Sequence, residues 1–87
     1  MDAKALHVRL RRIEGQVRGL QRMVEEGRDP IDVLTQLSAV GAALRVVGIG
    51  LLDDHARRCV RRGIERGDGG ESDIPALIEA AARLVGT

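Results

Sequence analysis

The chain has 87 residues and a formal net charge of +1, and it contains no Phe, Tyr or Trp. A chain this short forms at most one domain, here predicted over residues 1–87, and aliphatic residues alone must supply its core. Its single cysteine, Cys59, excludes an internal disulfide and a four-cysteine zinc site and indicates a reducing, cytoplasmic compartment. We therefore expect self-association to bury what one chain cannot.

The first predicted helix covers about residues 3–26 and ends near Gly27. Six apolar residues recur in it at alternating intervals of four and three, the spacing of a coiled-coil seam. These seam residues are Leu6, Leu10, Ile13, Val17, Leu20 and Val24. The spacing predicts a helix that packs through one stripe against a neighbour.

Basic residues dominate the rest of this helix. Lys4, Arg11 and Arg18 repeat every seven residues on the predicted outward side, and Arg9 and Arg12 flank them. The first 23 residues hold six basic and two acidic residues, a local balance of +4. This concentration of positive charge suits a polyanionic partner, although a merely solvated charged face gives the same pattern.

The second predicted helix runs from Pro30 to about residue 66. Asp29 is its expected N-cap and Pro30 its first residue, where the missing amide hydrogen is not needed. At ~1.5 Å per residue the helix is roughly 54 Å long, too long for one small chain to enclose. A second seam follows the same spacing: Val33, Leu37, Val40, Leu44, Val47 and Leu51. We expect other chains to bury this helix.

Two features of the second helix leave alternatives open. Gly48 and Gly50 indicate either close packing of a neighbouring helix or a kink or break. The apolar run from Leu37 to Leu52 is only 16 residues long and is interrupted by Ser38 and Arg45, so we expect no membrane span.

Residues 67–71 are predicted to form a loop, because three of the five are glycine. A third helix follows at about residues 73–85, and Pro75 is tolerable in its first turn. Its apolar positions are Ile74, Leu77, Ile78, Ala81 and Leu84. With no strand signal, the sequence predicts an all-α fold with a three-helix protomer.

One pair of residues on the second helix has metal-ligand chemistry. His55 and Cys59 are four residues apart, so both project from one face and could bind one ion. The alternative is a surface or interface histidine beside a packing cysteine. Two ligands alone do not make a site.

Three segments together resemble one known family. RLRRIEGQVRGLQRMVEE at residues 9–26, IDVLTQLSAV at residues 31–40 and DHARRCV at residues 54–60 are similar to the CsoR/RcnR transcriptional repressors. The resemblance implies an antiparallel four-helix-bundle dimer and a dimer of dimers, and a repressor that releases DNA when it binds its effector. It also implies that Arg9 and Arg12 contact DNA. Arg11 and Arg18 are further candidates, because they belong to the same predicted basic face.

In the copper-sensing branch of that family, Cu(I) binds across the dimer interface. One chain gives a cysteine at the start of the second helix, and the other gives a histidine and a cysteine one turn apart. His55 and Cys59 match the second half, but Pro30 stands at the first cysteine and supplies no ligand. A helix-3 glutamate that supports the copper switch also has no counterpart, since Pro75 lies near its position, and His7 does not match the nickel/cobalt branch.

Cu(I) or another transition metal is therefore expected to bind weakly or not at all. Three effector hypotheses remain: a degraded His55/Cys59 metal site, a redox or electrophile response of Cys59, or no effector.

The leading hypothesis is a repressor that binds double-stranded operator DNA as a homodimer or homotetramer, with a divergent effector site. The alternative is a helical oligomeric interaction module that has lost metal sensing or DNA binding. We do not expect an enzyme, because the chain has neither a Ser/His/Asp set nor a phosphate-binding glycine loop.

Overall fold

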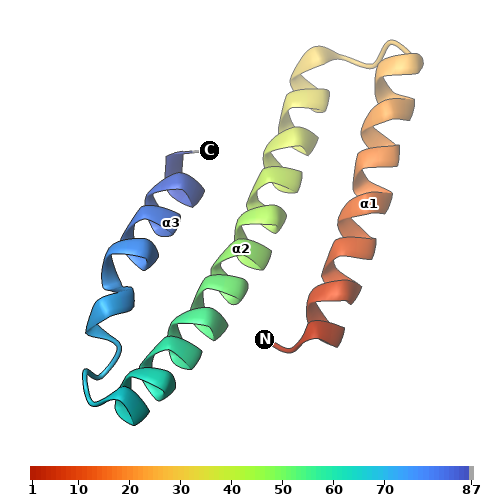
Figure 1. Ribbon diagram of the computed structural model, residues 1–87. Helices are drawn as coiled ribbons and strands as arrows, with labels where there is room; N and C mark the ends of the chain where they lie inside the picture. The colour runs from red at the N-terminus through yellow and green to blue at the C-terminus, as the bar shows by residue number, and fades with distance from the viewer. Residues whose placement is uncertain (87) are drawn as a thin grey trace. The chain divides into compact units, whose positions relative to one another are not determined.

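The computed structural model describes residues 1–86, and within that range it contains helices and no strands. Helix α1 spans Ala3–Glu25, α2 spans Pro30–Arg66 and α3 spans Ile74–Gly86, with a short 3-10 helix η1 at Glu71–Asp73 (Figure 1). The predicted all-α, three-helix protomer is confirmed. The chain divides into two compact units, Met1–Val47 and a second unit that begins at Gly48.

Side-chain caps fix where the first two helices start. Asp2 accepts a hydrogen bond from the backbone amide of Ala5 at 2.7 Å and so caps α1. Asp29 accepts from the amide of Ile31 at 2.8 Å, so the predicted N-cap is confirmed and Pro30 begins α2. Between the helices, Gly27 takes a left-handed conformation with φ of 67°, which glycine adopts without strain.

In the first unit, α1 and the beginning of α2 form an antiparallel helical hairpin (Figure 1). Its core is Ile13, Val40 and Val47, which are 4–6% exposed, with Leu6, Leu20 and Ala43 packed against them. Most other seam positions are uncovered in the single chain: Leu10, Val17, Val24, Leu37, Leu44 and Leu51 are 42–67% exposed, and Val33 is half-buried. The protomer therefore buries about half of each predicted seam.

In the second unit, α3 returns along α2 (Figure 1). Helix α2 is continuous from Pro30 to Arg66, so the alternative of a break at Gly48 and Gly50 is wrong. A Cβ at Gly48 would lie 2.6 Å from the Leu84 side chain of α3. Glycine at position 48 therefore allows close packing of α3, as the first alternative predicted.

The turn after α2 is packed directly onto that helix. A Cβ at Gly63 would collide with the backbone of Gly69 and Gly70. Gly67, Gly69 and Gly70 have φ values of 92°, 64° and 91°, which side chains other than glycine rarely adopt. The predicted loop of residues 67–71 is thus a tight turn, whose last residue, Glu71, already belongs to η1.

Hydrogen bonds of charged side chains stabilise this turn. The Arg66 guanidinium donates to Asp68, Ser72 and Asp73, and Asp68 also accepts from the Gly70 amide at 2.9 Å and from the Ser72 hydroxyl at 3.0 Å. The Gly70 hydrogen bond, helped by Ser72 and Arg66 and opposed by burial, lowers the pKa of Asp68. Hydrogen bonds from Arg66 to Asp73 and then Asp68 raise the pKa of Arg66.

Helix α2 is long and apolar enough to cross a membrane by length and composition alone, which differs from the expectation drawn from the Leu37–Leu52 run. Core helices of soluble proteins share this length and composition. The apolar surface of α2 needs a cover that the single chain does not supply.

We predict that two glycine substitutions have opposite effects on stability. Gly63→Ala forces the turn off α2 and should lower the free energy of unfolding by about 1–3 kcal/mol or more. Gly19→Ala is the matched control, because its Cβ would meet nothing within 4 Å. It should raise stability by about 0.5–1 kcal/mol. Urea denaturation followed by circular dichroism measures both, and equal effects would contradict the packing described.

We also predict that Asp68→Asn destabilises the protein only where Asp68 is ionised. Because the pKa of Asp68 is lowered by folding, its stabilisation is fully present above the unfolded-state pKa, about 4. It is lost as the pH falls through the lower folded-state pKa. Urea midpoints of the two proteins between pH 7 and pH 2 should therefore converge at the acid end, and a constant difference would refute the assignment.

Candidate functional site

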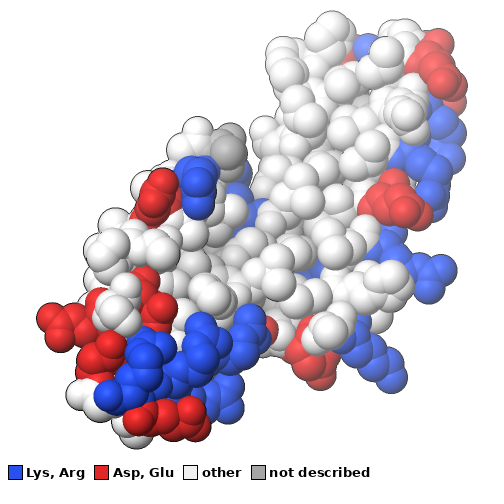
Figure 2. All heavy atoms as spheres, viewed as in Figure 1, with Lys and Arg blue, Asp and Glu red and all other residues white. Residues whose placement is uncertain are grey.

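The arginines of α1 fall into two sets. Arg9 and Arg12 line a small hollow between α1 and α2, together with Ile13, Gln16 and Ala43. The guanidinium of Arg18 donates instead to the Glu14 carboxylate at 3.0 Å. Figure 2 shows basic side chains along α1, with acidic ones among them.

The two sets of arginines differ in whether a carboxylate pairs with them. Within residues 1–86, no acidic side chain pairs with Arg9, Arg11 or Arg12, and all three are exposed. Since Arg18 already has a carboxylate partner, it has less to gain from an external anion. The four DNA-contact candidates are therefore not equivalent.

The α-helical spacing brings His55 and Cys59 together as predicted. Their Nε2 and Sγ atoms are 3.6 Å apart, and Cys59 is only 1% exposed. At this separation one ion could contact both atoms, because nitrogen and sulfur ligands bind such metals at ~2.0 Å and ~2.3 Å. The two donors thus fit one ion as part of a site.

Further ligands for such a site are not found among residues 1–86. No group of three or more His, Cys, Asp or Glu residues in the described part of the chain could hold a metal. His55 lies at a groove between α2 and α3 whose other walls are apolar: Gly48, Leu51, Leu52, Ala80 and Leu84.

Cys59 has a second neighbour that the sequence analysis did not identify. The guanidinium of Arg62 approaches Cys59 Sγ at 3.4 Å, from the turn of helix that follows. The sulfur therefore lies between an imidazole and a cation. Spacings of three and four residues on one helix predict these contacts, so the signal was present in the sequence.

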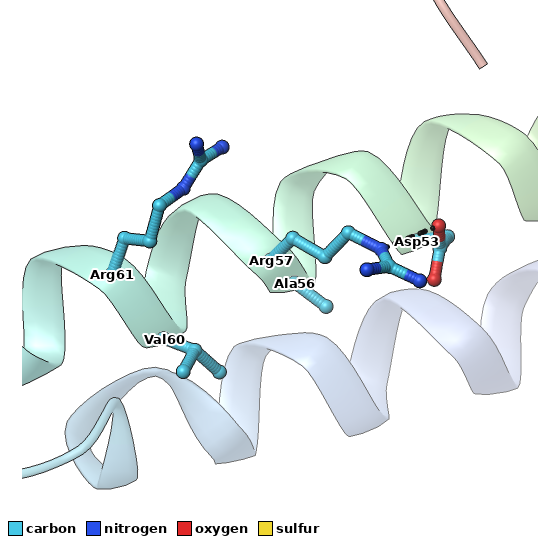
Figure 3. A pocket seen from close by; sticks show the side chains of 5 residues that line it. All are labelled: Asp53, Ala56, Arg57, Val60 and Arg61. Carbon is cyan, nitrogen blue, oxygen red and sulfur yellow. Dashed lines mark hydrogen bonds and ion pairs between the residues drawn. The ribbon is translucent and has the colours of Figure 1, made fainter.

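A second group of basic residues lies on the C-terminal half of α2 and was also missed, although the repeated Arg-Arg pairs in ARRCVRRGIER are its signal. Figure 2 shows basic side chains gathered near the turn into η1, beside acidic ones. Arg57 pairs with Asp53 at 3.0 Å, whereas Arg61 extends away from the helix at the edge of a shallow hollow (Figure 3). Positive charge is therefore not confined to α1.

Comparison with known proteins identifies the family. Residues 2–85 match the family described as metal-sensitive transcriptional repressor. The chain is 54% identical over 78 residues to the copper-sensing transcriptional repressor RicR of Mycobacterium tuberculosis (strain ATCC 25618 / H37Rv), covering 88% of this chain and 81% of RicR. It is 55% identical over 71 residues to the copper-sensing transcriptional repressor CsoR of Bacillus subtilis (strain 168), covering 82% and 69% of the two chains.

Two solved structures are also similar. The copper-sensing repressor CsoR with Cu(I) from Geobacillus thermodenitrificans NG80-2 aligns with a TM-score of 0.81 and 46% identity, over 94% of this chain and 84% of that one. The nickel-responsive transcriptional regulator InrS aligns with a TM-score of 0.84 and 39% identity, over 97% and 93% of the two chains.

These matches confirm the resemblance drawn from the three sequence segments, and the family comprises transcriptional repressors rather than enzymes. The helical hairpin, the basic α1 and the His55/Cys59 pair agree with that assignment. The chain belongs to the family of metal-sensitive transcriptional repressors.

Proposed function

We propose that this repressor is a cytoplasmic, single-domain protein that binds double-stranded operator DNA through α1, without enzymatic activity. The observation that carries the proposal is the absence of acidic partners for Arg9 and Arg12 among the described residues. Arginines without carboxylate partners can form bidentate contacts with phosphate at little competing cost. Arg11 adds to the positive field, and Arg18 contributes less because Glu14 neutralises it.

The DNA-binding form is proposed to be a homodimer or homotetramer built on an antiparallel four-helix bundle. The uncovered seam residues support this, since a second hairpin packed against Leu10, Val17 and Leu44 would bury them. Repetition of α1 in such an assembly produces an extended basic surface, suited to DNA rather than to a single small anion.

We predict that Arg9→Ala and Arg12→Ala weaken binding to the operator roughly tenfold each, because each removes a charge-assisted hydrogen bond to phosphate. The slope of log affinity against log salt should fall by about 0.9 for each phosphate that the variant no longer neutralises. Gel shifts on the DNA upstream of the protein's own gene, at several salt concentrations, measure both quantities.

Arg18→Ala is the matched control for that experiment. It removes the same side chain from the same helix, but one held by Glu14, so affinity and slope should change much less. An equal reduction in all three variants would mean that net charge alone binds DNA. No shift of the wild-type protein on this or related operators would favour the alternative, a helical interaction module that has lost DNA binding.

His55 and Cys59 are proposed to be half of a divergent metal site. Their 3.6 Å separation supports metal binding, whereas the 1% exposure of Cys59 argues against ready reaction with oxidants or electrophiles from solution. When bound, a metal would add positive charge and bridge these donors to ligands from elsewhere. Pro30 offers neither sulfur nor nitrogen, so Cu(I) would lack the soft third ligand expected of this family.

We predict that Cu(I) binds the wild-type protein more weakly than it binds the Pro30→Cys variant. Restoring a thiolate at the start of α2 supplies the missing soft ligand. Competition with a Cu(I) chelator measures the affinity, and release of operator DNA reports the response. Cys59→Ala and His55→Ala are the controls and should remove binding in both backgrounds.

Two results would contradict this interpretation. Equal Cu(I) affinities of the wild-type and Pro30→Cys proteins would show that position 30 does not face the site. Unchanged affinity in Cys59→Ala would show that the metal binds elsewhere.

A further inference from the structure

A polar hollow lies in the first unit, along the line where α1 meets α2. It has a volume of about 180 Å³ and is lined by Arg9, Arg12, Ile13 and Gln16 of α1 and by Ala43 of α2. Ile13 belongs to the buried core, so the inner wall is apolar, while the two arginines stand exposed at the rim. A group that enters the hollow therefore meets two cations and one amide.

The amide is unusual, because the Oε1 atom of Gln16 is buried and has no hydrogen-bond partner in the described part of the chain. Buried polar atoms are nearly always paired, so this oxygen requires an explanation. If position 16 served packing alone, an apolar side chain would fill it without an unpaired acceptor. Gln16 lines this hollow and also a second one that includes Arg22 and Arg28, and its buried oxygen has no donor from either side.

Arg12 lines the same hollow as Gln16 and is a candidate donor for that oxygen. Residues 12 and 16 are one helical turn apart, so their side chains lie together on α1. A guanidinium has five N–H groups in a rigid fork and can donate one to an amide while presenting others to a phosphate. No carboxylate among residues 1–86 competes for Arg12, in contrast to Arg18, which Glu14 holds.

We propose that this hollow receives one phosphate group of the bound DNA and that Gln16 is a positioning residue for Arg12. The Gln16 oxygen accepts a hydrogen bond from one Arg12 N–H group. This orients the remaining N–H groups of the guanidinium toward the phosphate, and Arg9 lies on the other side of the hollow. This inference rests on the proposed DNA binding. It adds an uncharged residue, Gln16, to the arginines that would bind the phosphate.

A double-mutant cycle on the operator tests this role. Gln16→Leu should weaken DNA binding by roughly threefold to tenfold, because Arg12 loses its orienting acceptor. In the Arg12→Ala background the same substitution should have no further effect, since its target is gone. In the Arg18→Ala background, the matched control, its effect should be the same as in the wild type.

Two additional measurements separate positioning from folding and from general anion binding. The thermal midpoint of Gln16→Leu should equal or exceed that of the wild type, because the unpaired acceptor is removed. Calorimetric titration of the DNA-free protein with inorganic phosphate should show at most weak binding, because a single anion lacks the many other phosphates of the DNA backbone.

The outcomes are distinct. A wild-type protein that binds DNA while Gln16→Leu binds equally well, or weakens by the same factor with and without Arg12, would overturn the positioning role alone. Tight binding of inorganic phosphate that depends on Gln16 would reassign the hollow to a free anion. Failure of the wild type to bind any operator would overturn the proposed function and this inference together.

Discussion

The structure depends on an apolar surface that one chain can only half cover. Ile13, Val40 and Val47 form the core of the hairpin, but the alternate seam residues stay 42–67% exposed. Burying one such side chain stabilises a protein by about 1.5–3 kcal/mol, a large part of the 5–15 kcal/mol that holds a domain folded. With no aromatic residue to enlarge the core, a second copy of the hairpin is the natural cover, and the proposed assembly would be a condition of folding as well as of DNA binding.

The same constraint bears on the proposed metal site and the proposed DNA-binding surface, because one chain supplies only part of each. A four-helix bundle made by two hairpins would bring the start of one chain's α2 toward the partner, so donors absent from one protomer can come from the other. His55 and Cys59 fit this arrangement, because their geometry suits one ion but supplies only two ligands. The proposed DNA contacts of α1 follow the same logic, since repeated basic segments in an assembly would neutralise more phosphates than one segment.

Local signals in the sequence were sufficient for the helices and for pairs of residues one turn apart. The Asp29 cap, the seam spacing and the His55–Cys59 pair follow from helix geometry alone. Which half of each seam faces inward does not, since both halves are equally apolar. Nor could the sequence show that Gly63 lies against Gly70, that Gly48 accommodates Leu84, or that the Gln16 oxygen is buried without a partner. Each of these depends on where a second helix or turn lies in space.

Pro30 shows how fold and sensing can diverge at one position. The first residue of an α-helix has no partner for its amide hydrogen, and proline's fixed φ suits it, so Pro30 after the Asp29 cap favours the start of α2. The family resemblance places a metal-binding cysteine at this position, where the helix needs nothing from the side chain. Proline in place of cysteine at position 30 therefore removes one expected ligand, while the backbone, the cap and the seam keep their geometry. This separation accounts for a chain that retains the family's fold across residues 2–85 and yet lacks one of its expected ligands.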